Sequence, residues 1–258
     1  MKREWRHEVS EKWLEARRIC LTASDIKNLI TDYKRIKAGK ITVKEAQQFA
    51  KVYGAKQQTN FDTESYGAMA RGHIMEPYAV SEYNTMATTA MHWWDDRLIV
   101  NGALGFSPDA LDREPMPGVI TRVNRNNGFL FCLDNPNFEC LGPQRMLEIK
   151  SYEAGAHFQR KMAVASDIKL DERWQVACAM VVCATIQYGT LMFYAPQCND
   201  WFTVNYDRED LKEEIDIILE IEKLWIEFRK AVSNVGHLVT TKTENEIYSL
   251  YLLDVMSS

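Results

Sequence analysis

Apolar and polar positions change their period along this 258-residue chain, and the change separates helical from strand-like segments. The first part predicts helices that begin and end at polar or capping residues, with Thr22 or Ser24 opening the second of them. From residue 87, short runs bounded by Gly, Pro, Asn and Asp predict strands instead. The predicted helices cover 10–30 (two helices with a tight connection), 43–54 and 64–84, with Pro77 kinking or restarting the last near Glu76. The predicted strands cover 88–93, 97–106, 118–122, 128–133 and 145–151.

The second part returns to helix and then adds two more strands. Helices are predicted over 155–165, 171–186 and 208–232, and strands over 186–194 and 201–206. The 208–232 helix has an apolar stripe that includes Leu211, Ile215, Ile218 and Trp225. The tail, 236–258, fits neither pattern. With no repeat and no linker, the chain predicts one α/β domain over 1–258 with a central mixed sheet flanked by helices.

The amino-acid composition excludes few classes of protein. The chain is 46% hydrophobic, and neither a membrane-spanning stretch nor a signal-peptide core is visible, so a cytoplasmic protein is expected. The six cysteines form no CxxC pair and predict reduced core thiols. A net charge of −5 neither favours nor excludes a nucleic-acid partner, because phosphate contacts need only a local basic patch.

The segment Met146–Lys150 carries the most specific chemistry. On a strand, Glu148 and Lys150 project from one face while Leu147 and Ile149 face a core. Asp109, after Ser-Pro, could meet Glu148 across a hard divalent cation, for which oxygen ligands suit Mg²⁺ or Mn²⁺. A lysine beside that cation could activate water or stabilise charge on a phosphate, which indicates metal-dependent phosphodiester cleavage.

The acid-Ile-Lys spacing alone is weak evidence. It also occurs at Asp25–Lys27, beside a helix start, and at Asp167–Lys169, in a polar loop. The alternative reading of Glu148 and Lys150 is a solvated strand face.

The acid-Ile-Lys spacing at Glu148 is one of five short motifs that follow one another along the chain. The motifs are the opening Trp13–Ser24 segment, Arg71–Glu76, Gly105–Leu111, Leu147–Lys150 and Trp174–Val176 with Met180. Together they resemble the phage lambda exonuclease family, also called the YqaJ-type viral recombinases, within the PD-(D/E)xK nucleases. The resemblance implies a restriction-endonuclease-like α/β core. Ala110 stands where the family usually has glycine.

The resemblance implies a metal site. Asp109 and Glu148 would bind the ions, the Ile149 carbonyl would add an oxygen ligand, and Glu76 would complete the site directly or through water. Two Mg²⁺ ions per site are expected, with Mn²⁺ able to substitute. The alternative reading of Glu76 is a surface carboxylate.

It also implies roles for the groups around the metal. Lys150 would activate the water or stabilise the transition state, and Gln175 would hydrogen-bond Lys150 or that water. Arg17 and Ser24 would bind the phosphate at a 5′ end, because arginine makes bidentate bonds and a helix start offers free N–H groups. The alternatives are a half-exposed helix residue for Gln175 and simple capping for Ser24.

The function implied is a Mg²⁺-dependent 5′→3′ exonuclease that acts on linear double-stranded DNA ends and releases 5′-mononucleotides. The resemblance further implies a homotrimer, a single-strand annealing protein as partner, and host cytoplasm as location if a phage encodes the chain. Two alternatives stay open: another PD-(D/E)xK endonuclease or repair nuclease with flap or single-strand preference, and a non-catalytic DNA-binding or assembly protein. Residues 112–145 are longer than in compact members and are interpreted as an inserted hairpin.

Overall fold

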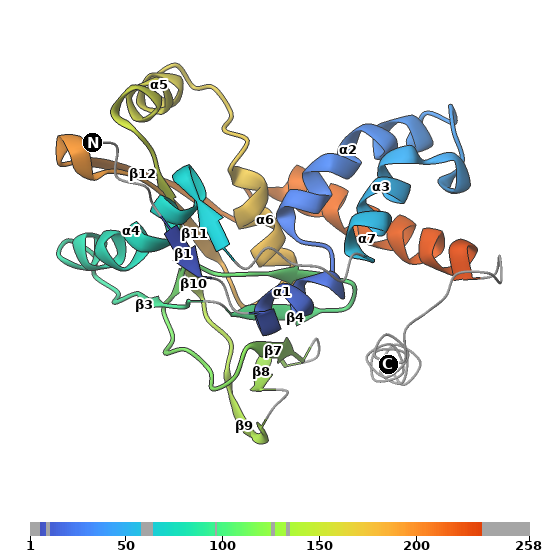
Figure 1. The fold of residues 1–258 in the computed structure, drawn as a ribbon, viewed down its shortest axis with the longest axis horizontal. Helices are drawn as coiled ribbons and strands as arrows, with labels where there is room; N and C mark the ends of the chain where they lie inside the picture. The colour runs from blue at the N-terminus through green and yellow to red at the C-terminus, as the bar shows by residue number, and fades with distance from the viewer. Residues whose placement is uncertain are drawn as a thin grey trace.

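The computed structural model describes residues 6–8, 11–57, 64–95, 97–124, 127–132 and 135–233 (Figure 1). The tail at 236–258 and the residues 58–63 between two predicted helices lie outside the described residues. Among the helices of the described part, none has the length and apolar character needed to cross a bilayer.

The sheet that carries the Glu148 strand has five strands in the order β12-β11-β10-β6-β3. Its central strand β10 pairs in parallel with β11 and antiparallel with β6, so the sheet is mixed. The edge strands β12 and β3 pair antiparallel with β11 and β6. The bounds are β3 His92–Trp93, β6 Ala110–Leu111, β10 Arg145–Ser151, β11 Tyr188–Ala195 and β12 Asp200–Asp207.

A second five-stranded sheet has the order β5-β4-β7-β8-β9, where the sequence predicted only one central sheet. The predicted strand at 97–106 is in fact two strands, which turn at Gly102 with a φ of +59°. Glycine adopts that left-handed backbone without the strain of a Cβ. The bounds are β4 Leu98–Asn101, β5 Leu104–Phe106, β7 Ile120–Val123, β8 Phe129–Cys132 and β9 Asn135–Leu141.

The segment 112–145 is more than an inserted hairpin. It contains three strands, and β7 pairs in parallel with β4 from outside the segment. The segment therefore completes a sheet with β4 and β5 and does not project alone from the β6–β10 pair. Thr121 and Leu130 on its strands are fully buried.

The helices follow the predicted pattern with shifted ends. Pro77 lies inside one continuous helix, α4, and no break separates the residues before and after it. A short pair of strands, β1 (Arg6–Glu8) and β2 (Glu64–Tyr66), precedes that helix. The bounds are α1 Glu11–Arg18, α2 Ala23–Lys37, η1 Val43–Glu45, α3 Gln47–Lys56, α4 Gly67–Asn84, α5 Ala154–Ala165, α6 Arg173–Val182, η2 Pro196–Cys198 and α7 Lys212–Ser233.

Helix α6 lies against the β10–β11 region of the main sheet, and α2, α3 and α7 form a layer beyond it (Figure 1). Seven of the ten residues of α6 are buried. An added Cβ at Gly189 of β11 would come within 2.1 Å of Val176 on α6, so the helix and the strand are in close contact there. Helix α4 packs on β10 from the other face, through Ala79 and Val80. Strand β10 is thus enclosed between two helices, which bury its residues 146–149 and fix the direction of their side chains.

Candidate active site

The alternation predicted for β10 is confirmed. Leu147 and Ile149 pack in one apolar cluster with Ala79 and Val80 of α4. On the α6 side, the Nζ of Lys150 lies 2.6 Å from Oε1 of Glu148, and Glu148 is only 4% exposed. Glu148 is therefore a buried acid paired with a lysine whose side chain is 22% exposed, and the reading as a solvated strand face does not hold for Glu148.

Gln175, in the first turn of α6, donates from Nε2 to Oε1 of Glu148 at 2.6 Å. The sequence predicted Lys150 or a water as its partner. Because both Lys150 and Gln175 donate to the same carboxylate oxygen, Gln175 orients Glu148 directly and Lys150 through it.

Asp109 reaches the same strand from the neighbouring chain segment. It precedes β6, whose Ala110 pairs with Leu147, and its Oδ2 accepts a hydrogen bond of 2.6 Å from the backbone N–H of Ile149. That N–H lies between Glu148 and Lys150 in sequence, so the bond places the Asp109 carboxylate beside both.

The carboxylates repel one another. Desolvation, followed by the charges of Glu148 and Glu76, raises the pKa of Asp109 well above its ordinary value, against the opposing effect of Lys150. Burial alone would lower the pKa of Lys150, but the charges of Glu148 and Asp109 outweigh it and raise that pKa. Lys150 is therefore held as a cation among acidic groups.

Glu76 comes to the site from α4, since its charge contributes to the raised pKa of Asp109. Its Oε1 lies 3.4 Å from Nδ1 of His73, one turn earlier on the same helix. The side chain is 12% exposed, so the alternative reading as an ordinary surface carboxylate is not supported.

In the part of the chain that the structure describes, no three His, Cys, Asp or Glu side chains gather as a ready-made metal centre. The candidate donors are nevertheless all oxygens, and the charges of Glu148 and Glu76 both act on the carboxyl of Asp109. Such a set suits a hard divalent cation, which would also relieve the repulsion that raises the pKa of Asp109.

Arg17 is joined to this site by a chain of contacts that the sequence did not reveal. Its guanidinium lies over the ring of Trp13, 4.4 Å from the ring centroid. The indole N–H of Trp13 donates to Oγ of Ser107 at 2.9 Å, two residues before Asp109. Trp13 lies in the Trp13–Ser24 motif and Ser107 in the Gly105–Leu111 motif, but the sequence predicted no role for either residue.

The charge of Arg17 also responds to the site. Desolvation lowers its pKa, while Cys20, Asp25 and Glu148 act in the opposite direction. An electrostatic effect of Glu148 on Arg17 means that the predicted phosphate-binding arginine and the predicted metal ligand belong to one region.

Ser24 lies exposed in the first turn of α2. The N-cap of that helix is Thr22, whose backbone N–H and Oγ1 both donate to Asp25, at 2.8 and 2.9 Å. Simple capping by Ser24 is therefore wrong, and Asp25 stabilises the start of the helix by accepting hydrogen bonds from its N-cap residue. Asp167, the other acid-Ile-Lys residue, is exposed in the turn after α5 with a φ of +55°.

The residue most clearly missed is Lys56, at the end of α3. Its Nζ lies 2.8 Å from Oδ2 of Asp25 and donates to the carbonyl of Arg17 at 3.0 Å. No sequence signal marks it, because a lysine at the last turn of a helix is ordinary.

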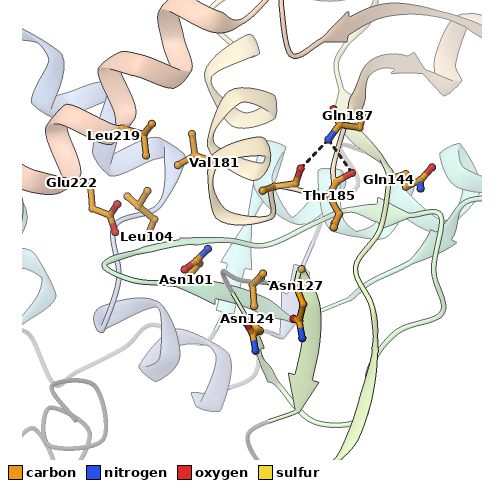
Figure 2. A pocket seen from close by; sticks show the side chains of 13 residues that line it. Asn101, Leu104, Asn124, Asn127, Gln144, Val181, Thr185, Gln187, Leu219 and Glu222 are labelled. Atoms are coloured by element: carbon orange, nitrogen blue, oxygen red, sulfur yellow. Dashed lines mark hydrogen bonds between the residues drawn. The ribbon is translucent and has the colours of Figure 1, made fainter. Parts of the chain in front are cut away.

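A cavity of about 640 Å³ lies at the other end of α6 (Figure 2). Amide side chains from several loops line it, and none of the candidate site residues is among the described residues that do so. Gln187 uses its amide N–H groups on the carbonyls of Ala184 and Thr185 in its own connection, at 2.9 and 3.5 Å. The cavity is thus separate from the carboxylate site.

Two solved structures have similar folds. An alkaline exonuclease from Laribacter hongkongensis, LHK-Exo, is 17% identical, with 88% of this chain and 100% of that chain covered and a TM-score of 0.50. A phage related exonuclease from Haemophilus somnus 129PT is 13% identical, with 84% and 96% covered and a TM-score of 0.48. The fold is the restriction-endonuclease-like fold, as predicted.

The family follows from the sequence itself. The model of the YqaJ-like viral recombinase domain matches residues 12–187, and the chain belongs to that family. No curated protein matches the chain. Family and fold together support a nuclease as the class of protein.

Proposed function

We propose that this protein is a metal-dependent exonuclease that degrades one strand of linear double-stranded DNA from its 5′ end and releases 5′-mononucleotides. The observation that carries the proposal is the continuity between Arg17 and the β10 carboxylates. Trp13 contacts both Arg17 and Ser107, and the charge of Glu148 acts on Arg17. A cation suited to a terminal phosphate thus adjoins a site suited to hydrolysis.

Asp109, Glu148 and Glu76 would hold Mg²⁺, with the Ile149 carbonyl as a further oxygen ligand and two ions per site. When bound there, Mg²⁺ supplies Lewis-acid stabilisation of the attacking and leaving oxygens of the phosphodiester. Mn²⁺ would substitute, since it takes the same oxygen ligands.

The side chains of the protein supply position and charge. Lys150, cationic and paired with Glu148 at 2.6 Å, would orient the attacking water and stabilise negative charge on the phosphate in the transition state. Gln175 would keep Glu148 in the orientation that serves both the cation and Lys150. Arg17, with Ser24 and the N–H groups at the start of α2, would bind the 5′-phosphate. This contact would determine which phosphodiester bond of the strand lies at Lys150.

The same proposal includes a homotrimer in solution, a single-strand annealing protein that takes up the exposed 3′ strand, and action in the cytoplasm of a host cell. Their support is membership of the YqaJ-like viral recombinase family.

Digestion of a 5′-phosphorylated linear duplex, labelled separately at each 5′ and 3′ end, tests the activity and its polarity. In Mg²⁺ the 5′ labels should be released as mononucleotides, and EDTA should stop the release. The same DNA as a closed circle should stay intact. Cutting of the circle would instead indicate an endonuclease, and cleavage of neither substrate would indicate a non-catalytic DNA-binding protein.

The Arg17→Ala variant should lose preference for phosphorylated ends. We expect the ratio of initial rates on 5′-phosphate and 5′-hydroxyl duplexes to fall about tenfold, because one charge-assisted bidentate contact is removed. Internal steps on a strand already engaged should slow much less. Equal losses on the two kinds of end would contradict the phosphate-binding role.

A further inference from the structure

Lys56 connects three elements at the proposed phosphate pocket. Besides the contacts of its Nζ with Asp25 and with the Arg17 carbonyl, its own carbonyl accepts a hydrogen bond of 2.9 Å from Nε of Arg18. The C-terminal ends of α1 and α3 thus bind each other reciprocally. The Lys56 side chain is 11% exposed, so its charge acts at short range with little screening by water.

The contact with Asp25 has an electrostatic consequence. Asp25 is the third residue of α2 and holds the N-cap of that helix through both donors of Thr22. An acid stabilises the helix start, but its negative charge opposes an anionic ligand at the same place. Asp25 also acts on Arg17, so it lies within the electrostatic range of the guanidinium.

We propose that Lys56 determines the specificity of this pocket for a 5′-phosphate by neutralising Asp25 while holding the backbone of Arg17. The inference rests on the proposed function and extends it to a residue that touches neither the metal ligands nor the scissile bond. With Lys56 present, Arg17 provides a net positive charge. Without it, Asp25 cancels the charge of Arg17, and a phosphorylated end gains nothing over a hydroxyl end.

The alternative is a purely structural clamp, and the two roles predict different results. A clamp acts on both kinds of DNA end alike and is not repaired by changing Asp25. A charge effect acts on phosphorylated ends and is repaired when Asp25 becomes neutral. Asparagine suits that repair because its Oδ1 still accepts the hydrogen bond from the Thr22 N–H.

The test compares initial rates on 5′-phosphate and 5′-hydroxyl linear duplexes for the unsubstituted protein, Lys56→Met, and Lys56→Met with Asp25→Asn. Lys37→Met is the matched control, since Lys37 lies on α2 and forms an exposed ion pair with Glu220 at 3.0 Å. Circular dichroism of each variant checks the fold. We expect the phosphate preference to fall about tenfold in Lys56→Met and to return within about threefold in the double variant.

Three outcomes are decisive in different ways. Lys56→Met with the preference of Lys37→Met overturns the role of Lys56 and leaves the proposed function intact. Equal loss of preference in the single and double variants also overturns it, in favour of a clamp. No preference in the unsubstituted protein overturns end recognition itself and the role of Lys56 with it.

Discussion

Lys150→Ala is expected to reduce DNA cleavage at least about a thousandfold, and Glu148→Ala to reduce it as much. The two side chains form one hydrogen-bonded unit, in which Lys150 and Gln175 donate to the same oxygen of Glu148. Removal of Lys150 takes away the cation that stabilises the transition state. Removal of Glu148 takes away a proposed metal ligand and the group that orients Lys150.

The measurement is the release of labelled mononucleotide from a 5′-phosphorylated linear duplex in Mg²⁺, under single-turnover conditions. Lys212→Ala is the control, because that lysine forms an exposed ion pair with Glu209 at 3.2 Å. Its rate should equal that of the unsubstituted protein. Near-normal cleavage by either β10 variant, with its fold intact by circular dichroism, would remove the catalytic assignment.

The β10 part of the site was predictable because its geometry is local. Side chains alternate on any strand, and a buried strand needs apolar residues on the face that packs. Leu147 and Ile149 therefore predict where Glu148 and Lys150 point, and the structure agrees. Helix α2 was predictable for the same reason, since its cap is encoded within Thr22–Asp25.

What could not be predicted depends on contacts between distant segments. The division of 97–106 into two strands is an exception, because β4 and β5 pair across a local turn and Asn101-Gly102 is a turn signal that the reading as one strand overlooked. The place of 112–145 depends on a parallel pairing of β7 with β4, for which a single sequence has no signal. Lys56 likewise meets Asp25 only because α3 packs against the start of α2.

The electrostatic repulsion among the carboxylates of the site should measurably lower the free energy of unfolding of the protein. The pKa of Asp109 is raised by desolvation and by Glu148 and Glu76. A carboxyl whose pKa is raised in the folded state favours folding at low pH, and this contribution is lost as the pH rises through the folded-state pKa. At pH 8, well above the ordinary carboxyl pKa, Asp109 therefore destabilises the metal-free protein relative to a neutral residue.

Asp109→Asn should abolish cleavage and yet raise the melting temperature of the protein in EDTA at pH 8 by about 2–5 °C. The asparagine keeps an oxygen that accepts the N–H of Ile149 but carries no charge. The difference in melting temperature should narrow as the pH falls towards about 4, the ordinary carboxyl pKa. Asp109 is then protonated and as uncharged as the asparagine.

Mg²⁺ should stabilise the two proteins to different extents. It should raise the melting temperature of the unsubstituted protein, because a cation that binds only the folded state stabilises it, and should have little effect on Asp109→Asn. Scanning calorimetry with EDTA and with Mg²⁺ provides both comparisons without any assay of activity. A variant that melts below the unsubstituted protein in EDTA would contradict the repulsion. An equal response of both proteins to Mg²⁺ would contradict Asp109 as a metal ligand, because a protein that has lost a ligand should bind the ion more weakly.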